Sequence, residues 1–392
     1  MDCDVLIAGA GCAGLSLAVH LIETGTQDLD ILLLDPREFH VRDRTWCYWP
    51  VVSHPFEAAV RHSWYRWRIL TDEGDASAGS PALGYRCLPS DAFYDLALER
   101  VEKAPNVRLS RGVSVDGFRP ADAGVIAATS EGDVVARQAF DSRPPSPGSP
   151  GRGEVEWTQH FIGLELETDR PVFNPSVATL MDFRTMDGPD VRFMYVLPFG
   201  ERRALVEDTF FGGEIRDEAE YVQAISEYLE EHLNAGTWRE IHRERGAIPM
   251  RTTPAPRATV PRVTHIGVRA DLARPSTGYA FLAIQRQAGL IAEQLARTGT
   301  EHPIPARRAY GRAATFLDRV FLAYLERKPD AAPGLFRDLF AGVAPDRLAR
   351  FMFDGGTVAD RLAVMRALPA GPLTRQALLG LGPAARDLMR RT

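Results

Sequence analysis

The sequence lacks several features that mark large classes of proteins. No stretch approaches the roughly 18–20 uncharged apolar residues that are needed to span a bilayer. Its 392 residues carry 46 basic and 52 acidic side chains, a net charge of −6, so the basic surface that nucleic acid requires is missing. The N-terminus shows no basic segment with a cleavage site. We therefore expect a cytoplasmic protein with no nucleic-acid partner.

Cysteine is scarce. The four cysteines, Cys3, Cys12, Cys47 and Cys87, form no C-x-x-C pair, and no histidine stands in metal-ligand spacing. This usage favours reduced thiols in a reducing compartment, and it argues against both a disulfide framework and a bound metal. Internal repeats with periods of 20–50 residues are also missing, which excludes a solenoid or propeller.

The N-terminal segment has the pattern of a strand–turn–helix–strand unit. Residues 3–8 are an apolar run typical of a buried strand, residues 15–22 have apolar positions at helical spacing, and residues 31–34 form a second apolar run. Between the first strand and the helix lies the loop Gly9-Ala10-Gly11-Cys12-Ala13-Gly14. Asp35 ends the second strand.

This G-x-G-x-x-G loop predicts a dinucleotide site. Gly9 would make the tight turn, Gly11 would let backbone amides approach a pyrophosphate, and Gly14 would allow close helix–strand packing. Asp35 would hydrogen-bond the adenosine ribose, and the helix N-terminus would favour the phosphates. The alternative is a glycine-rich turn in an α/β protein that binds no dinucleotide.

A second segment decides between FAD and NAD. Residues 264–268 read as a buried strand that contains Gly267, and Pro275-Ser276-Thr277-Gly278-Tyr279 opens a helix expected over 279–296. This layout resembles the second flavin-binding segment of the p-hydroxybenzoate-hydroxylase-like FAD superfamily. The resemblance implies that Gly267, Pro275, Gly278 and Tyr279 contact FAD. Many members of that superfamily have an aspartate where Val268 stands.

The remaining pattern predicts an α/β fold: a Rossmann-type FAD-binding domain, a mixed β-sheet substrate domain and a helical C-terminal region. Strands are expected over 161–167, 177–182, 192–198 and 203–210, followed by a helix over 220–233. The expected ranges are 1–60, 100–150 and 255–300 for the FAD-binding domain, 61–99 and 151–254 for the substrate domain, and 301–392 for the helical region.

Several scattered motifs together resemble one family, the lycopene cyclases of carotenoid biosynthesis. They span most of the chain in the family's order, and the combination is far more specific than any single piece. The motifs are Asp43-Arg44-Thr45-Trp46-Cys47-Tyr48-Trp49, Phe140-Asp141-Ser142-Arg143-Pro144-Pro145, Gln159-His160-Phe161-Ile162-Gly163, Tyr195-Val196-Leu197-Pro198-Phe199, Leu205-Val206-Glu207-Asp208-Thr209, Gly246-Ala247-Ile248-Pro249-Met250 and Arg274-Pro275-Ser276-Thr277-Gly278-Tyr279.

The resemblance implies an isomerase that closes the ψ ends of lycopene into β-ionone rings, giving β-carotene via γ-carotene. A proton added to C2 leaves a cation at C1, the C5–C6 double bond attacks it, and a proton leaves C6. The reaction is not a net oxidation or reduction, yet the family requires reduced FAD, with NAD(P)H as reductant. Cyclisation of another polyprenyl or carotenoid substrate, and an FAD-dependent monooxygenase of the same fold, remain alternatives.

Protonation of an alkene requires a carboxylic acid that stays protonated near neutral pH, and three carboxylates are candidates. Glu207 and Asp208 are adjacent on an expected strand, so they must point to opposite faces. The family's acidic motif places the general acid at Glu207, and Asp208 would tune it or bind backbone. Glu244 is a second candidate, as proton acceptor or hydrogen-bond anchor. Without the resemblance, solvated strand-end carboxylates would be the simpler interpretation.

Aromatic residues near these motifs are candidates for contact with a polyene, because aromatic faces suit both an apolar chain and a cation. Ordinary core packing is the alternative for each of them. The candidates are Trp46, Tyr48, Trp49, Tyr195 and Phe199, and Arg44 beside them is assigned to the cofactor together with Cys12 and Ala13 of the glycine loop.

The C-terminal tail has an amphipathic character. Residues 368–388 are apolar, interrupted by proline and glycine, and flanked by arginines. Short helices of this kind suit transient contact with a membrane surface, which an enzyme acting on a lipid-dissolved polyene requires. We expect peripheral association with the inner face of the membrane, with a packed core helix as the alternative.

Overall fold

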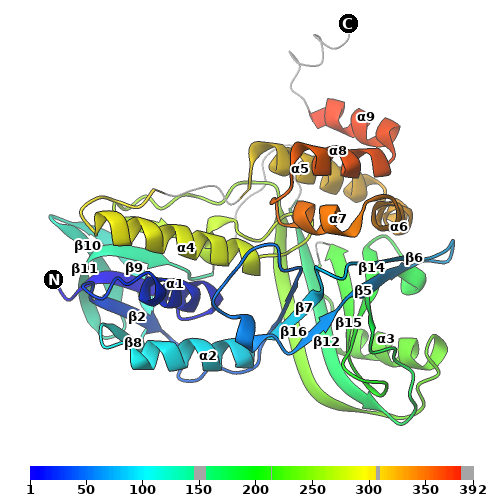
Figure 1. The fold of residues 1–392 in the computed structure, drawn as a ribbon, viewed down its shortest axis with the longest axis horizontal. Coiled ribbons are helices and arrows are strands. Elements are labelled where there is room, and N and C mark those ends of the chain that lie inside the picture. Colours follow the sequence, from blue (N-terminus) through cyan, green and yellow to red (C-terminus); the bar gives the residue numbers. More distant parts are fainter. Residues whose placement is uncertain (145–155, 213, 306–309, 381–392) are drawn as a thin grey trace, which may run out of the picture.

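The computed structural model describes residues 1–144, 156–212, 214–305 and 310–380. Within these residues the chain forms two large sheets side by side, with helices over the first sheet and a helical region above the second (Figure 1). The domain boundary that we expect near residue 150 and the last part of the amphipathic tail, 381–392, lie outside the described residues. No helix of the described part is long and apolar enough to cross a membrane.

The first sheet confirms the Rossmann-type prediction. Its strand order is β8-β2-β1-β11-β10-β9, and β17 pairs with β11. The strands β1, β2, β8, β11 and β17 run parallel where they pair, and β9–β11 form an antiparallel meander. The bounds are β1 Cys3–Ala8, β2 Ile31–Asp35, β8 Val107–Arg111, β9 Val115–Ala121, β10 Gly124–Thr129, β11 Gly132–Asp141 and β17 Val263–His265.

Helices cover this sheet as the apolar spacing predicts. Helix α1 (Cys12–Glu23) packs against α4 (Phe281–Thr298), and α2 (Ser90–Lys103) packs against α1 and β8 (Figure 1). The strand expected over 264–268 is shorter than predicted, because Gly267 takes a left-handed φ of +66° and a short 3-10 turn, Gly267–Ala270, follows. The helix expected from residue 279 begins two residues later, at Phe281.

The second sheet is mixed and has the order β16-β12-β15-β14-β13-β5-β6. Its strands are antiparallel except for the parallel pair β13–β5. The expected strands over 177–182, 192–198 and 203–210 are confirmed to within two residues. The bounds are β5 Arg66–Leu70, β6 Ala76–Gly79, β12 Glu156–Thr168, β13 Val177–Asp182, β14 Val191–Pro198, β15 Arg203–Gly212 and β16 Trp238–Arg251.

The two faces of β15 have different environments, as the period of two requires. Ala204, Val206 and Phe210 pack with α3 (Glu218–Glu231), which covers one face of the sheet. Leu205 and Phe211 belong to the large core on the opposite face. The side chains of β15 are thereby divided between a helix-covered face and a face turned toward the rest of the molecule.

A small third sheet and the C-terminal helices complete the fold. The sheet has the order β3-β7-β4 and carries much of the aromatic motif around residue 46. The helices lie above the second sheet (Figure 1). The bounds are β3 Thr45–Tyr48, β4 His62–Trp64, β7 Tyr85–Pro89, α5 Arg312–Arg327, α6 Ala332–Gly342, α7 Pro345–Met352, α8 Val358–Ala367 and α9 Ala370–Gly380.

A buried ion pair ties the helical region to the loop before α4. Arg274 is fully buried, and its guanidinium donates to the carboxylate of Asp318 on α5 over 3.0–3.2 Å. The Ser276 hydroxyl donates to the same carboxylate at 2.8 Å, and Arg274 also donates to the Phe351 carbonyl at the end of α7. The loop is therefore held by α5 and α7 as well as by its own sheet.

Candidate active site

The glycine loop has the geometry of a phosphate site. Gly9 has a φ of +96°, and a Cβ on Gly14 would lie 1.8 Å from the Gly9 carbonyl oxygen, so neither position accepts a side chain. Helix α1 follows with Gly11 as its N-cap and no side chain capping it. The first N–H groups of this helix are therefore left to be satisfied by a ligand or water, and they favour an anion.

Asp35 lies beside this loop but is already engaged. Its carboxylate accepts a hydrogen bond from the Ala10 N–H at 2.6 Å and two from the Arg37 guanidinium at 2.9 and 3.0 Å. Burial alone would raise the pKa of Asp35, but the hydrogen bonds from Arg37 and the backbone lower it below the ordinary value. The Arg37 guanidinium also lies over Gly11, within 3.6 Å of a Cβ placed there. The sequence analysis did not single out Arg37.

The second glycine segment meets the first. A Cβ on Gly267 would lie 2.6 Å from the Cβ of Ala13, so the two predicted cofactor segments are in direct contact. Gly278 has a φ of +68°, and a Cβ there would lie 2.4 Å from Oε1 of Gln159. That buried amide oxygen has no hydrogen-bond partner among the described residues. A polar atom in this state beside the loop fits a ligand that donates a hydrogen bond.

A cavity of about 1220 Å³, counted to its open mouth, lies between the two sheets and the helical region. The predicted residues that line it are Arg44, Trp46, Tyr195, Glu207, Gly278 and Tyr279. Other walls are apolar and come from the second sheet, the start of α4, and the ends of α6 and α7. They include Phe161, Phe193, Phe211, Phe281, Phe336, Phe340, Met352 and Phe353.

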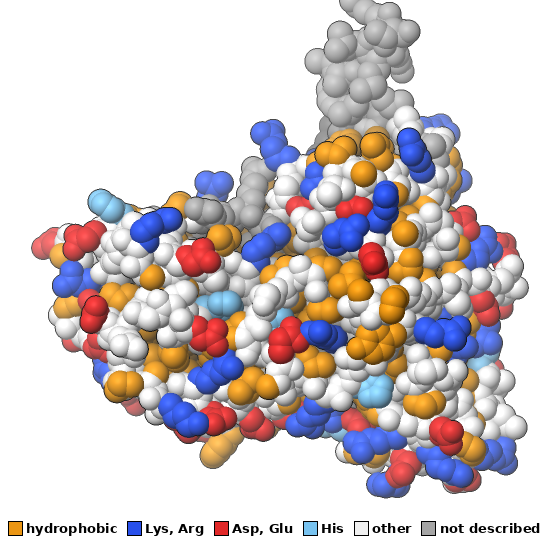
Figure 2. All heavy atoms as spheres, viewed as in Figure 1, with side chains coloured by type: hydrophobic (Ala, Val, Ile, Leu, Met, Phe, Trp, Pro, Cys, Tyr) orange, Lys and Arg blue, Asp and Glu red, His pale blue; other side chains and the backbone are white. Residues whose placement is uncertain are grey.

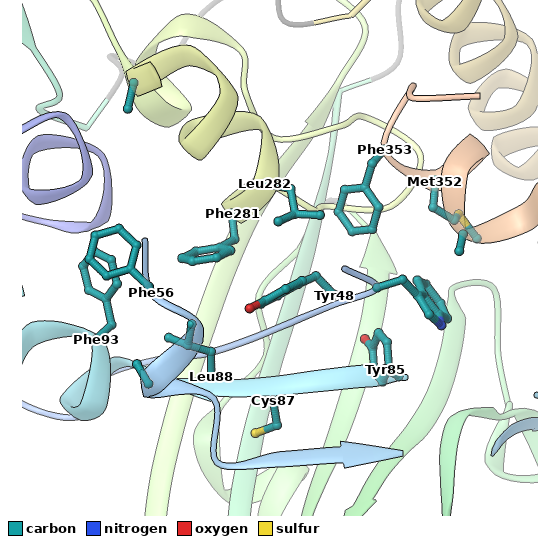
Figure 3. Packing of buried hydrophobic residues seen from close by; sticks show 14 of the residues in the cluster. Tyr48, Phe56, Tyr85, Cys87, Leu88, Phe93, Phe281, Leu282, Met352 and Phe353 are labelled. Carbon is teal, nitrogen blue, oxygen red and sulfur yellow. The ribbon is translucent and has the colours of Figure 1, made fainter. Parts of the chain in front are cut away.

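Three of the predicted substrate-binding aromatics do not line the cavity. Tyr48 lies beneath Phe281, with the ring centroids 5.1 Å apart, and its hydroxyl is 2.7 Å from Nε2 of His54 (Figure 3). Trp49 is buried against other aromatic rings, and Phe199 packs beside His62 and Trp64. Tyr48 and Trp49 are buried core residues and Phe199 is partly buried against the same core, so packing holds all three without a ligand.

Glu207 and Glu244 form a buried carboxyl pair at the cavity wall. They lie on β15 and β16, the two strands that flank β12, and both are directly opposite Gly163 in register. A Cβ on Gly163 would lie 2.8 Å from Cγ of Glu207 and 3.2 Å from Cγ of Glu244. The missing side chain of Gly163 leaves the space in which the two side chains meet and hydrogen-bond.

Burial sets the chemistry of this pair. Glu207 is 7% exposed and Glu244 4% exposed. Burial raises the pKa of Glu207 well above its ordinary value, and the charge and hydrogen bonding of Glu244 raise it further. Burial also raises the pKa of Glu244, although hydrogen bonds from Glu207 and Thr45 oppose the increase. At least one carboxyl of the pair therefore holds a proton well above the pH at which free glutamate ionises.

The two glutamates are held differently. Glu207 lines the cavity, whereas Glu244 lies behind it and accepts a hydrogen bond from the Thr45 hydroxyl at 2.9 Å. Two residues along β12 from Gly163, the buried Glu165 pairs with Arg42 at 2.6 Å and with Arg203. Those arginines compensate the charge of Glu165, so this neighbouring carboxylate is not left unpaired beside Glu207 and Glu244.

Asp208 is on the opposite side of the sheet. Its carboxylate accepts hydrogen bonds from Nε and Nη2 of Arg192, at 2.9 and 3.1 Å, and the Arg192 guanidinium lies over the ring of Phe210. His160 is on this side as well, 2.6 Å from the Tyr221 hydroxyl. Strand β15 carries both Glu207 and Asp208, and it separates the Asp208 side chain from the cavity.

Three tyrosines line another part of the cavity, of which Tyr85 is buried and Tyr195 and Tyr279 are partly buried. The Tyr85 hydroxyl lies 2.9 Å from that of Tyr195 and 3.0 Å from that of Tyr279. Burial raises the pKa of all three phenols above the ordinary value, so they stay neutral. Tyr279 also stacks on Phe353, with the ring centroids 5.2 Å apart. These contacts fix the cofactor segment against the helical region.

The most important residue that the sequence analysis missed is Gly163. It stands in a quoted motif, but nothing in the sequence shows that it lies between two acids, because strand register is set by pairing across the sheet. Thr45, which anchors Glu244, was missed for the same reason. Phe281, which lies against Trp46 with centroids 5.7 Å apart, could have been found from its position at the start of the expected helix.

A largely parallel sheet with a glycine loop, joined to a mixed sheet across an apolar cavity, is a fold also found in solved structures of a reductase-like protein and of flavin-dependent monooxygenases. A geranylgeranyl bacteriochlorophyll reductase-like protein of Thermoplasma acidophilum matches with a TM-score of 0.67 and 14% identity, over 95% of this chain and 98% of its own. The flavin-dependent monooxygenase PieE, solved with FAD and substrate, matches with a TM-score of 0.60 and 16% identity, over 96% of this chain and 72% of its own.

Sequence comparison is more specific. A lycopene beta-cyclase of Paracoccus sp. (strain N81106 / MBIC 01143) is 29% identical over 95% of this chain and 96% of its own. The family model described as lycopene cyclase protein matches residues 4–378. The chain belongs to the lycopene cyclase family and is an enzyme of that family.

Proposed function

We propose that this enzyme cyclises the ψ ends of lycopene to β-ionone rings, giving β-carotene via γ-carotene. The observation that carries the proposal is the buried carboxyl pair of Glu207 and Glu244 at the wall of an apolar cavity. An acid that keeps its proton while facing apolar surroundings is what protonation of an alkene requires.

In this mechanism Glu207 is the general acid, because it is the member of the pair that reaches the cavity. Its proton is added to C2 of the terminal double bond, which leaves a cation at C1. The C5–C6 double bond attacks C1, closes the ring and moves the charge to C5. Loss of the C6 proton to the carboxyl pair restores the starting protonation state, so protons and electrons balance over the cycle.

Glu244 has two tasks in this proposal. Its hydrogen bond with Glu207 and its own burial keep a proton on the pair, and its bond to Thr45 holds it in place. Trp46 and Phe281 present stacked rings at the wall, and such faces stabilise a passing cation. Asp208, paired with Arg192 on the other face, has a structural role.

We further propose FAD as the cofactor, held by the first sheet, while the second sheet holds the substrate and the helical region closes the cavity. The amides of Gly11, Cys12, Ala13 and Gly14 would bind the pyrophosphate, and the segment from Gly267 to Tyr279, with Gln159, would face the flavin. Asp35 would contact the adenosine ribose of FAD, and Arg44 would contact the side of the cofactor that carries the flavin ring. When bound and reduced by NAD(P)H, the group supplies negative charge that stabilises a cation.

We also propose transient contact with the inner face of the membrane through α8. Val358, Leu362 and Met365 are exposed and share one side of this helix at spacings of four and three residues. Figure 2 shows hydrophobic side chains gathered over this part of the helical region. Arg366 on the same helix is exposed and would approach anionic headgroups, whereas Arg361 is paired with Asp354 at 3.0 Å.

The test is conversion of lycopene by the whole chain. A lycopene-accumulating bacterium that expresses the protein should change from red to orange-yellow and contain γ-carotene and β-carotene. Unchanged lycopene in cells that contain soluble, flavin-loaded protein would refute the substrate assignment. Incorporation of oxygen from O₂ into the product would instead support a monooxygenase.

A further inference from the structure

The helical region contains a second apolar groove, with an empty volume of about 960 Å³. Side chains of α5, α6, α7, α8 and α9 line it, and nearly all of them are apolar. Asp318 is the charged exception, and it is neutralised by the buried Arg274.

The groove adjoins the cavity that contains Glu207. Four residues line both spaces: Ser276, Thr277, Phe336 and Met352. Phe336 comes from α6, Met352 from the end of α7, and Ser276 and Thr277 from the loop before α4, and together they form the partition between the two spaces. A methionine is a flexible partition, because its unbranched side chain has three rotatable bonds.

At its other end the groove opens to the surface. Phe316 of α5 and Met365 of α8 line it and are 43% and 51% exposed. Met365 belongs to the exposed apolar side of α8, which continues the lining outward. An apolar passage thus runs from the surface of the helical region to the partition at Phe336 and Met352.

We propose that this groove is the binding site for the distal part of the polyene. The inference rests on the proposed function, in which one end of a long, rigid and wholly apolar chain must reach Glu207. The cavity is bounded opposite Glu207 by helical residues and also has to hold the flavin beside Gly278, so the remainder of the chain must leave it. The adjoining groove is apolar, open at its far end and separated from the cavity by a partition in which Met352 is flexible and Phe336 is packed against Phe183 and Phe321.

This assignment separates two roles in recognition. The cavity recognises the reacting end and brings it to the acid, whereas the groove binds the part of the chain that does not react. Substrates that keep the reactive end but lack the distal half should therefore be independent of the groove. Full-length substrates should depend on it.

Two exposed apolar positions give a matched test. Met365 lines the groove, whereas Ile215, in the segment before α3 and 59% exposed, does not. Met365→Trp should narrow the groove and Ile215→Trp should not, while both add the same ring to the surface. Because both side chains are about half exposed, flavin content and thermal stability should stay at the wild-type level in each variant.

The assay is performed on the FAD-loaded full chain in detergent micelles, with lycopene and with an apo-lycopenal that keeps one ψ end and about half the length. In a Glu207→Gln background, Met365→Trp should weaken lycopene binding roughly tenfold, which corresponds to the loss of a few buried methylene groups. With Glu207 present it should raise KM for lycopene similarly. The apo-lycopenal should bind and react as in the wild type, and Ile215→Trp should change the binding and turnover of neither substrate.

Two results would overturn the inference while the proposed function stood. One is unchanged lycopene affinity in Met365→Trp when the wild type converts lycopene. The other is an equal loss for the long and the short polyene. If the wild-type protein converted neither polyene, the proposed function would fail, and this inference with it.

Discussion

Glu207 and Glu244 meet above Gly163, a residue with no side chain to separate them. Both acids lie opposite that glycine on the strands that flank β12. The arrangement brings together two carboxyls that are 37 positions apart in the sequence. Because both are buried, their proximity keeps a proton on the pair, and this property is what the proposed chemistry uses.

Gly163→Ala should reduce activity and lower the free energy of unfolding by about 1–3 kcal/mol, because the added Cβ overpacks the space between two buried side chains. The added Cβ would lie 2.8 Å from Cγ of Glu207, so that side chain must move. Displacement of a catalytic group by about 1 Å costs on the order of 100-fold in kcat. Gly117→Ala on β9 is the control, because a Cβ there meets nothing within 4 Å. Steady-state cyclisation rates and thermal unfolding of both variants would check this, and an active Gly163→Ala enzyme would contradict the geometry.

Replacement of Glu207 should lower activity, whereas replacement of the adjacent Asp208 should lower stability. Glu207→Gln keeps the shape but removes the proton, so kcat should fall roughly 100- to 10,000-fold while FAD stays bound. Asp208→Asn breaks its pairing with Arg192, so the free energy of unfolding should fall by about 3 kcal/mol with activity largely kept. Product formation and denaturant unfolding would be measured on both variants. Full activity in Glu207→Gln would show that Glu207 is not the general acid.

Glu244→Gln should move the pH dependence of the reaction. Burial and then the charge of Glu244 raise the pKa of Glu207, so removal of that charge lowers this pKa while burial still keeps it above ordinary. The acid must be protonated to act, so activity is lost as pH rises through its pKa. The alkaline limb of kcat/KM should therefore shift to lower pH in Glu244→Gln. Superimposable profiles would show that the two carboxyls do not interact.

The raised pKa of Glu207 also predicts how stability depends on pH. Above the ordinary glutamate pKa the unfolded chain releases a proton that the folded chain retains, so the free energy of unfolding falls as pH rises toward the folded-state pKa. Glu207→Gln lacks this group and should lose less stability over the same interval. Thermal unfolding of both proteins across that pH range measures the difference.

Gly11→Val should separate folding from cofactor binding. A Cβ at this position meets only the end of the Arg37 side chain, at 3.6 Å, so the apoprotein should fold normally. The larger side chain would obstruct the amides that we assign to the pyrophosphate, which should weaken FAD binding by about thirtyfold, the worth of a charged hydrogen bond. Visible flavin absorbance and apoprotein unfolding are the measurements. Full FAD occupancy in the variant would place the pyrophosphate elsewhere.

Glutamates on α8 should weaken binding to lipid vesicles. Val358→Glu with Leu362→Glu removes two exposed apolar side chains and adds charge of the wrong sign for an anionic surface. Sedimentation with anionic vesicles should show roughly a tenfold weaker interaction. Ile215→Glu, at an exposed apolar position in the segment before α3, is the control. Equal sedimentation of all three proteins would refute the proposed contact.

Local patterns in the sequence were sufficient for much of the fold. The apolar runs of β1 and β2 depend on neighbouring residues only, as does the alternating orientation of the side chains along β15, and the structure confirms them. Boundaries near positive-φ glycines were less predictable, as at Gly267, because the backbone turn and not the apolar pattern ends the strand. Side-chain periodicity depends on residues that are close together in the sequence, and it predicts an element correctly where local interactions alone determine that element.

Neither the acid pair nor the groove could be predicted from local sequence patterns. The opposite orientation of Glu207 and Asp208 follows from strand geometry, and the structure places the two on opposite faces. The contact of Glu207 with Glu244 depends on the pairing of three strands around Gly163, which a single sequence does not encode in any local pattern. Tyr48 and Trp49 show the converse, since their motif resembles a binding segment but their rings are buried in the core.

The ion pair between Arg274 and Asp318 limits how this protein can be dissected. A chain that ended before α5 would lose the Asp318 carboxylate and the Phe351 carbonyl that hold Arg274, and it would expose this guanidinium to water. The loop that carries Gly278 and Tyr279 would lose these contacts and would therefore rearrange. The C-terminal helices are therefore an integral part of the flavoprotein rather than a detachable module, and they could not be exchanged between relatives without that loop.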